Sequence, residues 1–107
     1  MIDINDLKKI GQDILNFEGS ILALYKDDLG EFYLHSFLND GTGKVYYRTT
    51  EDFLNKFYES EITIRELFML SLDLKVVIGS HFAKPIFVKK IDLIDKLHCG
   101  HLRFSEF

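Results

Sequence analysis

The chain is poor in cysteine, proline and tryptophan: it has one cysteine, one proline and no tryptophan. A single cysteine, Cys99, excludes an intramolecular disulfide framework. No apolar run approaches the roughly 20 residues that a membrane-spanning helix needs. The acid-containing first residues do not resemble a secretion signal, which begins with basic residues and continues as an apolar run. We therefore expect a cytoplasmic protein without a membrane anchor.

Basic residues are also in the minority. The chain has 13 Lys and Arg against 17 Asp and Glu, which gives a formal net charge of -4. A surface of this charge weakly repels phosphate backbones and anionic lipids. We therefore expect no nucleic acid and no membrane among its partners.

The apolar content is ordinary for a globular domain. Hydrophobic residues make up 47% of the chain and charged residues 28%, and Phe 10 with Tyr 5 supplies bulky core material. A chain of 107 residues can build one hydrophobic core but not two. The sequence predicts a single domain over residues 1–107.

Glycine turns separate segments that are rich in β-branched and aromatic residues, the pattern of antiparallel strands. The turns are Asp28-Leu29-Gly30 and 40–43, where glycine permits a positive φ. An N-terminal helix to Ile10 is expected before the strands. The predicted strands are 13–17, 21–27, 31–39, 44–48, 75–78 and 86–91.

Two helices are expected between the predicted strands 44–48 and 75–78. The first begins at Thr49 or Thr50, which can cap a helix, and runs to about Glu59. The second begins at Thr63, which stands three residues before Glu66 in a capping-box pattern. Helical spacing assigns these residues to the buried faces: Phe53, Leu54, Phe57 and Tyr58 in the first helix, and Ile64, Leu67, Phe68 and Leu72 in the second.

Together these elements predict an α+β fold. We expect an antiparallel sheet of about four to six strands, two central helices packed on one face, and short terminal helices. Both faces of the predicted strand 31–39 carry apolar side chains. The face away from the helices is therefore either buried under the terminal segments or left open as an aromatic platform.

Residues 12 to 78 contain a strand meander followed by two helices, and the second helix opens with Ile62-Thr63-Ile64-Arg65-Glu66-Leu67-Phe68. This pattern resembles a family of small bacterial and phage-associated domains of unknown function, in which the same place reads I-[ST]-[IL]-R-E-L-F. The chain departs from the family at Ser20-Ile21, where many relatives have a proline. The resemblance implies the fold and a bacterial context, and it assigns no functional residue to this chain.

An open aromatic face would make a protein-interaction surface. The residues that would form it are Tyr25, Tyr33, Phe37 and Tyr46. A small acidic domain with many rings and no convergent polar motif is typical of a non-catalytic interaction or accessory module, and we expect that function. The resemblance implies a role such as an immunity-type inhibitor or a regulator of a neighbouring gene product. A homodimer and a monomer remain open.

Two alternatives give the chain a different role. A small ligand-binding domain or enzyme could form a pocket near His35, Tyr47, Arg48 and His81 once the chain folds. Stacking of single-stranded nucleic acid on the tyrosines is possible in geometry, but the negative charge opposes it.

The densest group of potential metal ligands is His98, Cys99 and His101, with His81 as a fourth. The pattern lacks the separated ligand pairs of structural zinc sites, so we favour a helix over residues 92–99 that is capped at Gly100. Asp27 and Asp28 are interpreted as turn residues. We assign no catalytic residue, no metal site and no cofactor.

Overall fold

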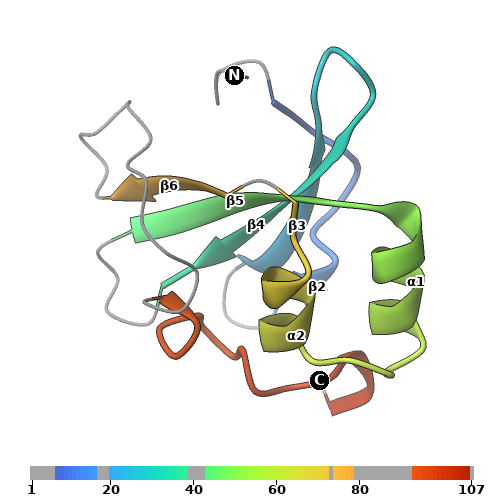
Figure 1. Cartoon of the computed structure of the whole chain (residues 1–107), viewed down its shortest axis with the longest axis vertical. Coiled ribbons are helices and arrows are strands. Elements are labelled where there is room, and N and C mark those ends of the chain that lie inside the picture. The colour runs from blue at the N-terminus through green and yellow to red at the C-terminus, as the bar shows by residue number, and fades with distance from the viewer. Residues whose placement is uncertain (1–6, 17–19, 39–42, 73, 79–92, 107) are drawn as a thin grey trace.

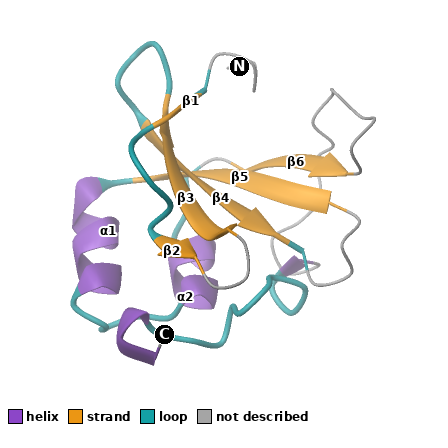
Figure 2. Cartoon of the chain, turned by 180° about the vertical axis from the view of Figure 1, so that it is seen from behind, coloured by secondary structure: helices purple, strands orange, loops and turns teal. Residues whose placement is uncertain are grey.

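The computed structural model describes residues 7–16, 20–38, 43–72, 74–78 and 93–106. They form an antiparallel sheet in the order β1-β3-β4-β5-β6, with β2 also paired to β3. Two helices lie on one side of this sheet (Figure 1, Figure 2). The α+β prediction is confirmed. The strands are β1 (Lys8–Lys9), β2 (Leu15–Asn16), β3 (Ser20–Lys26), β4 (Phe32–Phe37), β5 (Gly43–Thr49) and β6 (Leu74–Ile78).

The turn between β3 and β4 is built by one aspartate and one glycine. The Oδ1 atom of Asp27 accepts the backbone N–H groups of Leu29 and Glu31, both at 2.9 Å. Gly30 has a φ of 85°, which a side chain would disfavour. The predicted hairpin is confirmed. The second predicted turn falls in 39–42, which lies outside the described residues.

Both helices begin at the predicted threonines. Helix α1 (Glu51–Tyr58) has Thr50 as its N-cap, and the hydroxyl accepts the backbone N–H of Phe53 at 3.2 Å. Helix α2 (Ile64–Met69) has Thr63 as its N-cap, and both halves of the capping box with Glu66 are formed. The two caps satisfy amides that have no partner inside the helices.

Helix α1 ends in a Schellman motif with serine where glycine is usual. Ser60 has a φ of 61°, and its N–H donates to the carbonyl of Phe57 while that of Glu61 donates to Lys56, both at 2.9 Å. This pattern satisfies the last carbonyls of the helix. It turns the chain directly into the N-terminus of α2.

The main core lies between the sheet and the helices. Leu34, Val45 and Tyr47 from the sheet are fully buried against Phe57, Leu67 and Phe68 from the helices. Two predicted core residues are exposed, Tyr58 at 41% and Leu72 at 50%, and Phe53 is only partly buried. Tyr58 packs on the ring of Phe104 at the surface. Leu72 lies beyond the end of α2, where helical spacing no longer holds.

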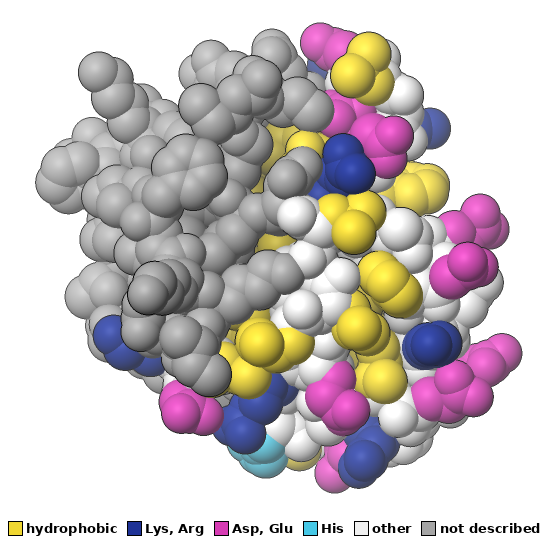
Figure 3. All heavy atoms as spheres, in the orientation of Figure 1, with side chains coloured by type: hydrophobic (Ala, Val, Ile, Leu, Met, Phe, Trp, Pro, Cys, Tyr) yellow, Lys and Arg dark blue, Asp and Glu magenta, His cyan; other side chains and the backbone are white. Residues whose placement is uncertain are grey.

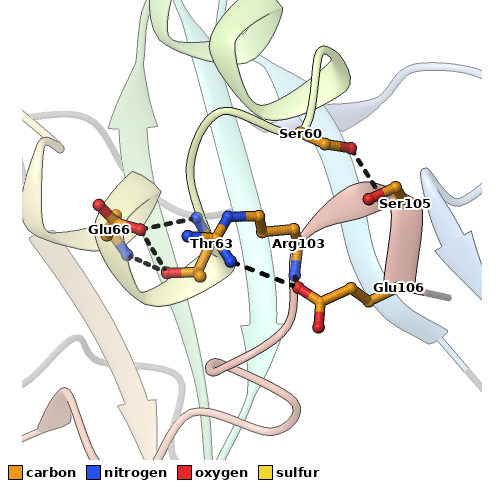
Figure 4. A network of polar contacts seen from close by, with 6 residues as sticks. All are labelled: Ser60, Thr63, Glu66, Arg103, Ser105 and Glu106. Carbon is orange, nitrogen blue, oxygen red and sulfur yellow. Dashed lines mark hydrogen bonds and ion pairs between the residues drawn. The ribbon is translucent and has the colours of Figure 1, made fainter.

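The C-terminal segment completes the fold in a way that the sequence did not predict. The carbonyls of Leu102 and Gly100 accept the first amides of α2, those of Ile64 and Arg65, at 3.1 and 2.8 Å. Further along, the N–H of Ser105 donates to the hydroxyl of Ser60 at 2.9 Å (Figure 4). The segment ends in a short 3-10 helix, Phe104–Glu106. The C-terminal segment therefore supplies hydrogen-bond acceptors for the first amide groups of α2, which have no acceptor inside the helix.

The bounds predicted for two terminal helices are wrong where the structure describes those residues. Residues 93–101 form turns over most of their length, and Cys99 rather than Gly100 takes the left-handed conformation, with a φ of 57°. Gly100 is needed for space, because a Cβ there would lie 3.1 Å from the Cβ of Leu97. At the other end, Lys8–Lys9 is a strand paired with β3, where a helix to Ile10 was expected. The predicted strand 86–91 lies outside the described residues.

Candidate functional site

The sheet face away from the helices carries a cluster of rings. The register pairs Tyr25 with Tyr33 and His35 with Tyr46, so these side chains project from the same face. The centroid of the His35 ring lies 4.7 Å from that of Phe37, 5.0 Å from Tyr46 and 5.9 Å from Tyr25. The structure therefore brings together the four aromatic residues that the sequence analysis selected, with a histidine among them.

Most of this ring cluster is not available to a partner. Tyr33 is 1% exposed and Tyr46 is 6% exposed, and both belong to one buried cluster with Leu7. Tyr25 is partly buried, and Phe37 alone has 41% of its surface exposed. Of the predicted surface, only Phe37 and part of Tyr25 can touch another molecule without a rearrangement.

Burial sets the protonation of the cluster. Desolvation, reinforced by the nearby charge of Lys44, lowers the pKa of His35 to about 4, so the imidazole is neutral at pH 7. Desolvation also raises the pKa of Tyr46 to about 12, with contributions from the charge of Tyr25 and a hydrogen bond to it. A neutral imidazole packed among neutral rings behaves as core material in this arrangement.

The alternative pocket does not converge around His35. Tyr47 follows Tyr46 in β5 and therefore points to the opposite face, where it is fully buried and its hydroxyl lies 2.9 Å from that of Ser36. Burial raises the pKa of the Tyr47 phenol. Arg48 pairs with Tyr33 in the register and so lies on the His35 face. His81 lies outside the described residues.

The histidines and the cysteine near the C-terminus do not form a metal centre among the described residues, which contain no group of three or more His, Cys, Asp or Glu side chains able to hold an ion. His98 and His101 are both exposed. Cys99 is partly buried, and desolvation raises the pKa of its thiol. A raised pKa disfavours the thiolate, which is the nucleophilic form.

A second surface, on the helical side, was missed by the sequence analysis. Met69, Leu70 and Leu72 are 41%, 39% and 50% exposed. Met69 and Leu70 line a groove of about 270 Å³ along α2 together with Ile62 and Ile94, and Leu72 follows two residues after Leu70 in the chain. Hydrophobic side chains gather over the helices on this side of the molecule, with charged side chains to their right and below them (Figure 3). We call Ile62, Met69, Leu70, Leu72 and Ile94 the α2 surface.

The polar residues beside the groove already have structural partners. Glu66 accepts the N–H of Thr63 at 3.1 Å through its Oε1 atom, and a guanidinium nitrogen of Arg65 lies 3.5 Å from a carboxylate oxygen of Asp95. These contacts confirm Glu66 as a cap. The signal for this surface was the run Met69-Leu70-Ser71-Leu72, which adds apolar residues outside the stripe that faces the core.

Comparison with known proteins adds no further constraint: no family model, no curated protein and no solved structure matches this chain. Within the described part of the chain, none of the helices has the length and apolar character needed to cross a bilayer. The candidate site therefore rests on the geometry above.

Proposed function

We propose that this protein is a non-catalytic interaction module of the cytoplasm that binds another protein through the α2 surface. The observation that carries the proposal is the exposure of Met69, Leu70 and Leu72 next to one another, at 41%, 39% and 50%. Contiguous exposed apolar side chains with a polar rim are typical of protein-binding surfaces. The charged residues around the groove supply such a rim.

The size of the groove favours a protein over a small molecule. At about 270 Å³ it is smaller than the roughly 300 to 1,000 Å³ of most ligand pockets. A groove of this size accommodates one or two anchoring side chains of a partner, which commonly supply most of the binding energy. The capping role of Glu66 and the ion pair of Arg65 give both residues structural duties.

The resemblance noted in the sequence suggests the kind of partner. A bacterial or phage-associated accessory protein would act on a neighbouring gene product, as an inhibitor or a regulator. A second copy of the chain is the other candidate, because an apolar surface can pair with itself across a two-fold axis. Light scattering of the purified protein distinguishes a homodimer from a monomer that binds a different protein.

The test is quantitative capture of partners from the native cell with matched variants. We expect Leu70→Glu/Leu72→Glu to lose the stoichiometric partner, because two carboxylates would replace two exposed apolar side chains of the α2 surface. The control is Leu29→Glu, which adds the same group at the 81% exposed tip of the β3–β4 turn. This variant should retain the partner.

Thermal unfolding of the variants separates binding from folding. Substitutions of exposed side chains generally change stability by less than about 0.5 kcal/mol, so all three proteins should unfold at similar temperatures. Equal capture by the wild type and Leu70→Glu/Leu72→Glu, with the protein folded, would contradict the proposal.

A further inference from the structure

A cavity of about 540 Å³ lies on the side of the molecule where β2 and β3 meet the C-terminal segment. Its volume falls within the range of roughly 300 to 1,000 Å³ that is usual for small-molecule sites. The cavity is separate from the α2 surface and shares no lining residue with the groove there. The described residues that line it are Ile14, Leu15, Asn16, Ile21, Cys99, Leu102 and Glu106.

Backbone hydrogen bonds attach each wall of this cavity to a neighbouring element. On one side, β2 pairs with β3 through Leu15 and Leu22. On the other side, the carbonyl of Leu102 accepts the N–H of Ile64 at 3.1 Å, at the N-terminus of α2. One wall is therefore paired to β3 and the other is hydrogen-bonded to α2, and this anchoring preorganises the site for a ligand.

Apolar side chains make up most of the lining. Leu15 and Ile21 are 6% and 3% exposed and belong to the main core, and Ile14 packs against that core. Cys99 adds a thiol that is protonated at neutral pH, because burial raises its pKa. An alkyl chain or an aromatic ring would bury its surface against these walls.

The two polar residues at the cavity both offer acceptor oxygens. Asn16 donates its amide nitrogen to Asp13 at 2.9 Å, which directs its carbonyl oxygen to other partners. Glu106 receives the backbone N–H and the guanidinium of Arg103 on the same atom, Oε1, at 2.9 and 3.8 Å. Its Oε2 atom has no such contact among the described residues. A ligand that brings a hydrogen-bond donor suits these oxygens, and a positive charge suits the carboxylate.

We propose that this cavity binds a small apolar molecule that carries an ammonium group. The apolar part lies against Ile14, Ile21 and Leu102, and the ammonium donates to Glu106 and Asn16. Ligand binding in this cavity would be a second activity, and it does not depend on protein binding at the α2 surface.

The sole cysteine of the chain reports on occupancy. Cys99 lines the cavity, so a bound ligand should slow its reaction with a chromogenic aromatic disulfide at pH 8. Octylammonium at ten times its Kd should slow the reaction by about tenfold. Hexylammonium should bind about fifteenfold more weakly, because each buried CH₂ contributes about a fourfold gain in affinity. Octanoate should protect poorly, since its carboxylate faces that of Glu106.

Two variants and one matched control assign the effect to the cavity. Ile14→Trp fills the cavity and should abolish protection. Ile62→Trp makes the same change at another isoleucine packed against the core, beside α2, and should keep it. Glu106→Gln retains an acceptor for Arg103 but removes the charge, so the preference for octylammonium over octanoate should fall.

Three results would overturn the proposal. The first is an unchanged rate of Cys99 modification at millimolar octylammonium. The second is equal protection by octanoate. The third is protection that persists in a folded Ile14→Trp variant.

Discussion

Replacing His35 by phenylalanine should remove a large part of the acid sensitivity of this protein. The imidazole is 5% exposed and packs among Tyr25, Phe37 and Tyr46. Its pKa is lowered to about 4 from an ordinary 6.5, first by desolvation and then by the charge of Lys44. The imidazole of His35 therefore binds a proton more weakly in the folded state than in the unfolded chain.

The magnitude follows from the two pKa values. Each pH unit between them corresponds to about 1.4 kcal/mol, so full protonation of the unfolded chain costs about 3 kcal/mol of folding free energy. The stability contributed by neutral His35 is present above pH 6.5 and is lost as the pH falls toward 4. At pH 5 the loss should be about 2 kcal/mol, a substantial part of the roughly 5 to 15 kcal/mol that stabilises a typical domain.

Urea unfolding at pH 7 and pH 5, followed by circular dichroism, measures this loss. The midpoint of the wild type should fall by about 1 M urea more than that of His35→Phe, given an m-value of roughly 1 to 3 kcal/mol per M. The control is His101→Phe, which removes an exposed imidazole and should behave as the wild type. Equal loss of stability in the wild type and His35→Phe would refute the reasoning.

Two further predictions concern polar contacts, one exposed and one buried, and both are measured as free energies of unfolding in urea. Ser60→Ala should cost about 1 kcal/mol, because it removes the hydrogen bond to Ser105 and keeps a side chain at positive φ. Ser60→Gly should be more stable than Ser60→Ala, and the reverse order would contradict the strain argument. Tyr47→Phe should cost about 1 to 2 kcal/mol by orphaning the Ser36 hydroxyl, which is fully buried. Adding Ser36→Ala should recover part of this loss, and no recovery would contradict the pairing.

The parts of the fold that the sequence predicted well depend on contacts between residues close together in the chain. The Asp27 turn needs only the amides that follow it, and the Thr63 capping box needs only Glu66. Short-range signals of this kind can be read before the tertiary structure is known.

The errors arose where distant segments decide the local conformation. The first amides of α2 are satisfied by Gly100 and Leu102, so the residues around these two carbonyls follow the N-terminus of α2 and do not form the predicted helix. At the other end, Lys8–Lys9 pairs with β3. The local sequence of both segments was compatible with a helix, and pairing to a remote backbone overrode it.

The candidate site was predicted only in part. Strand alternation correctly placed Tyr25, Tyr33 and Phe37 on one face, but periodicity alone does not say what covers a face. The α2 surface was overlooked because Leu72 was extrapolated from a helical stripe that ends at Phe68, before the helix itself stops at Met69. Exposure of the residues after Phe68 depends on where the chain turns toward β6.

The central claim is that partners meet this protein on the α2 surface and not on the ring cluster. Hydroxyl-radical footprinting of the free protein and of its captured complex tests this claim residue by residue. We predict that Leu70 and Leu72 are oxidised in the free protein and protected in the complex, while Tyr33 and Tyr46 stay unreactive in both. Reactive Tyr33 and Tyr46 that become protected on binding, with Leu70 and Leu72 unchanged, would contradict it.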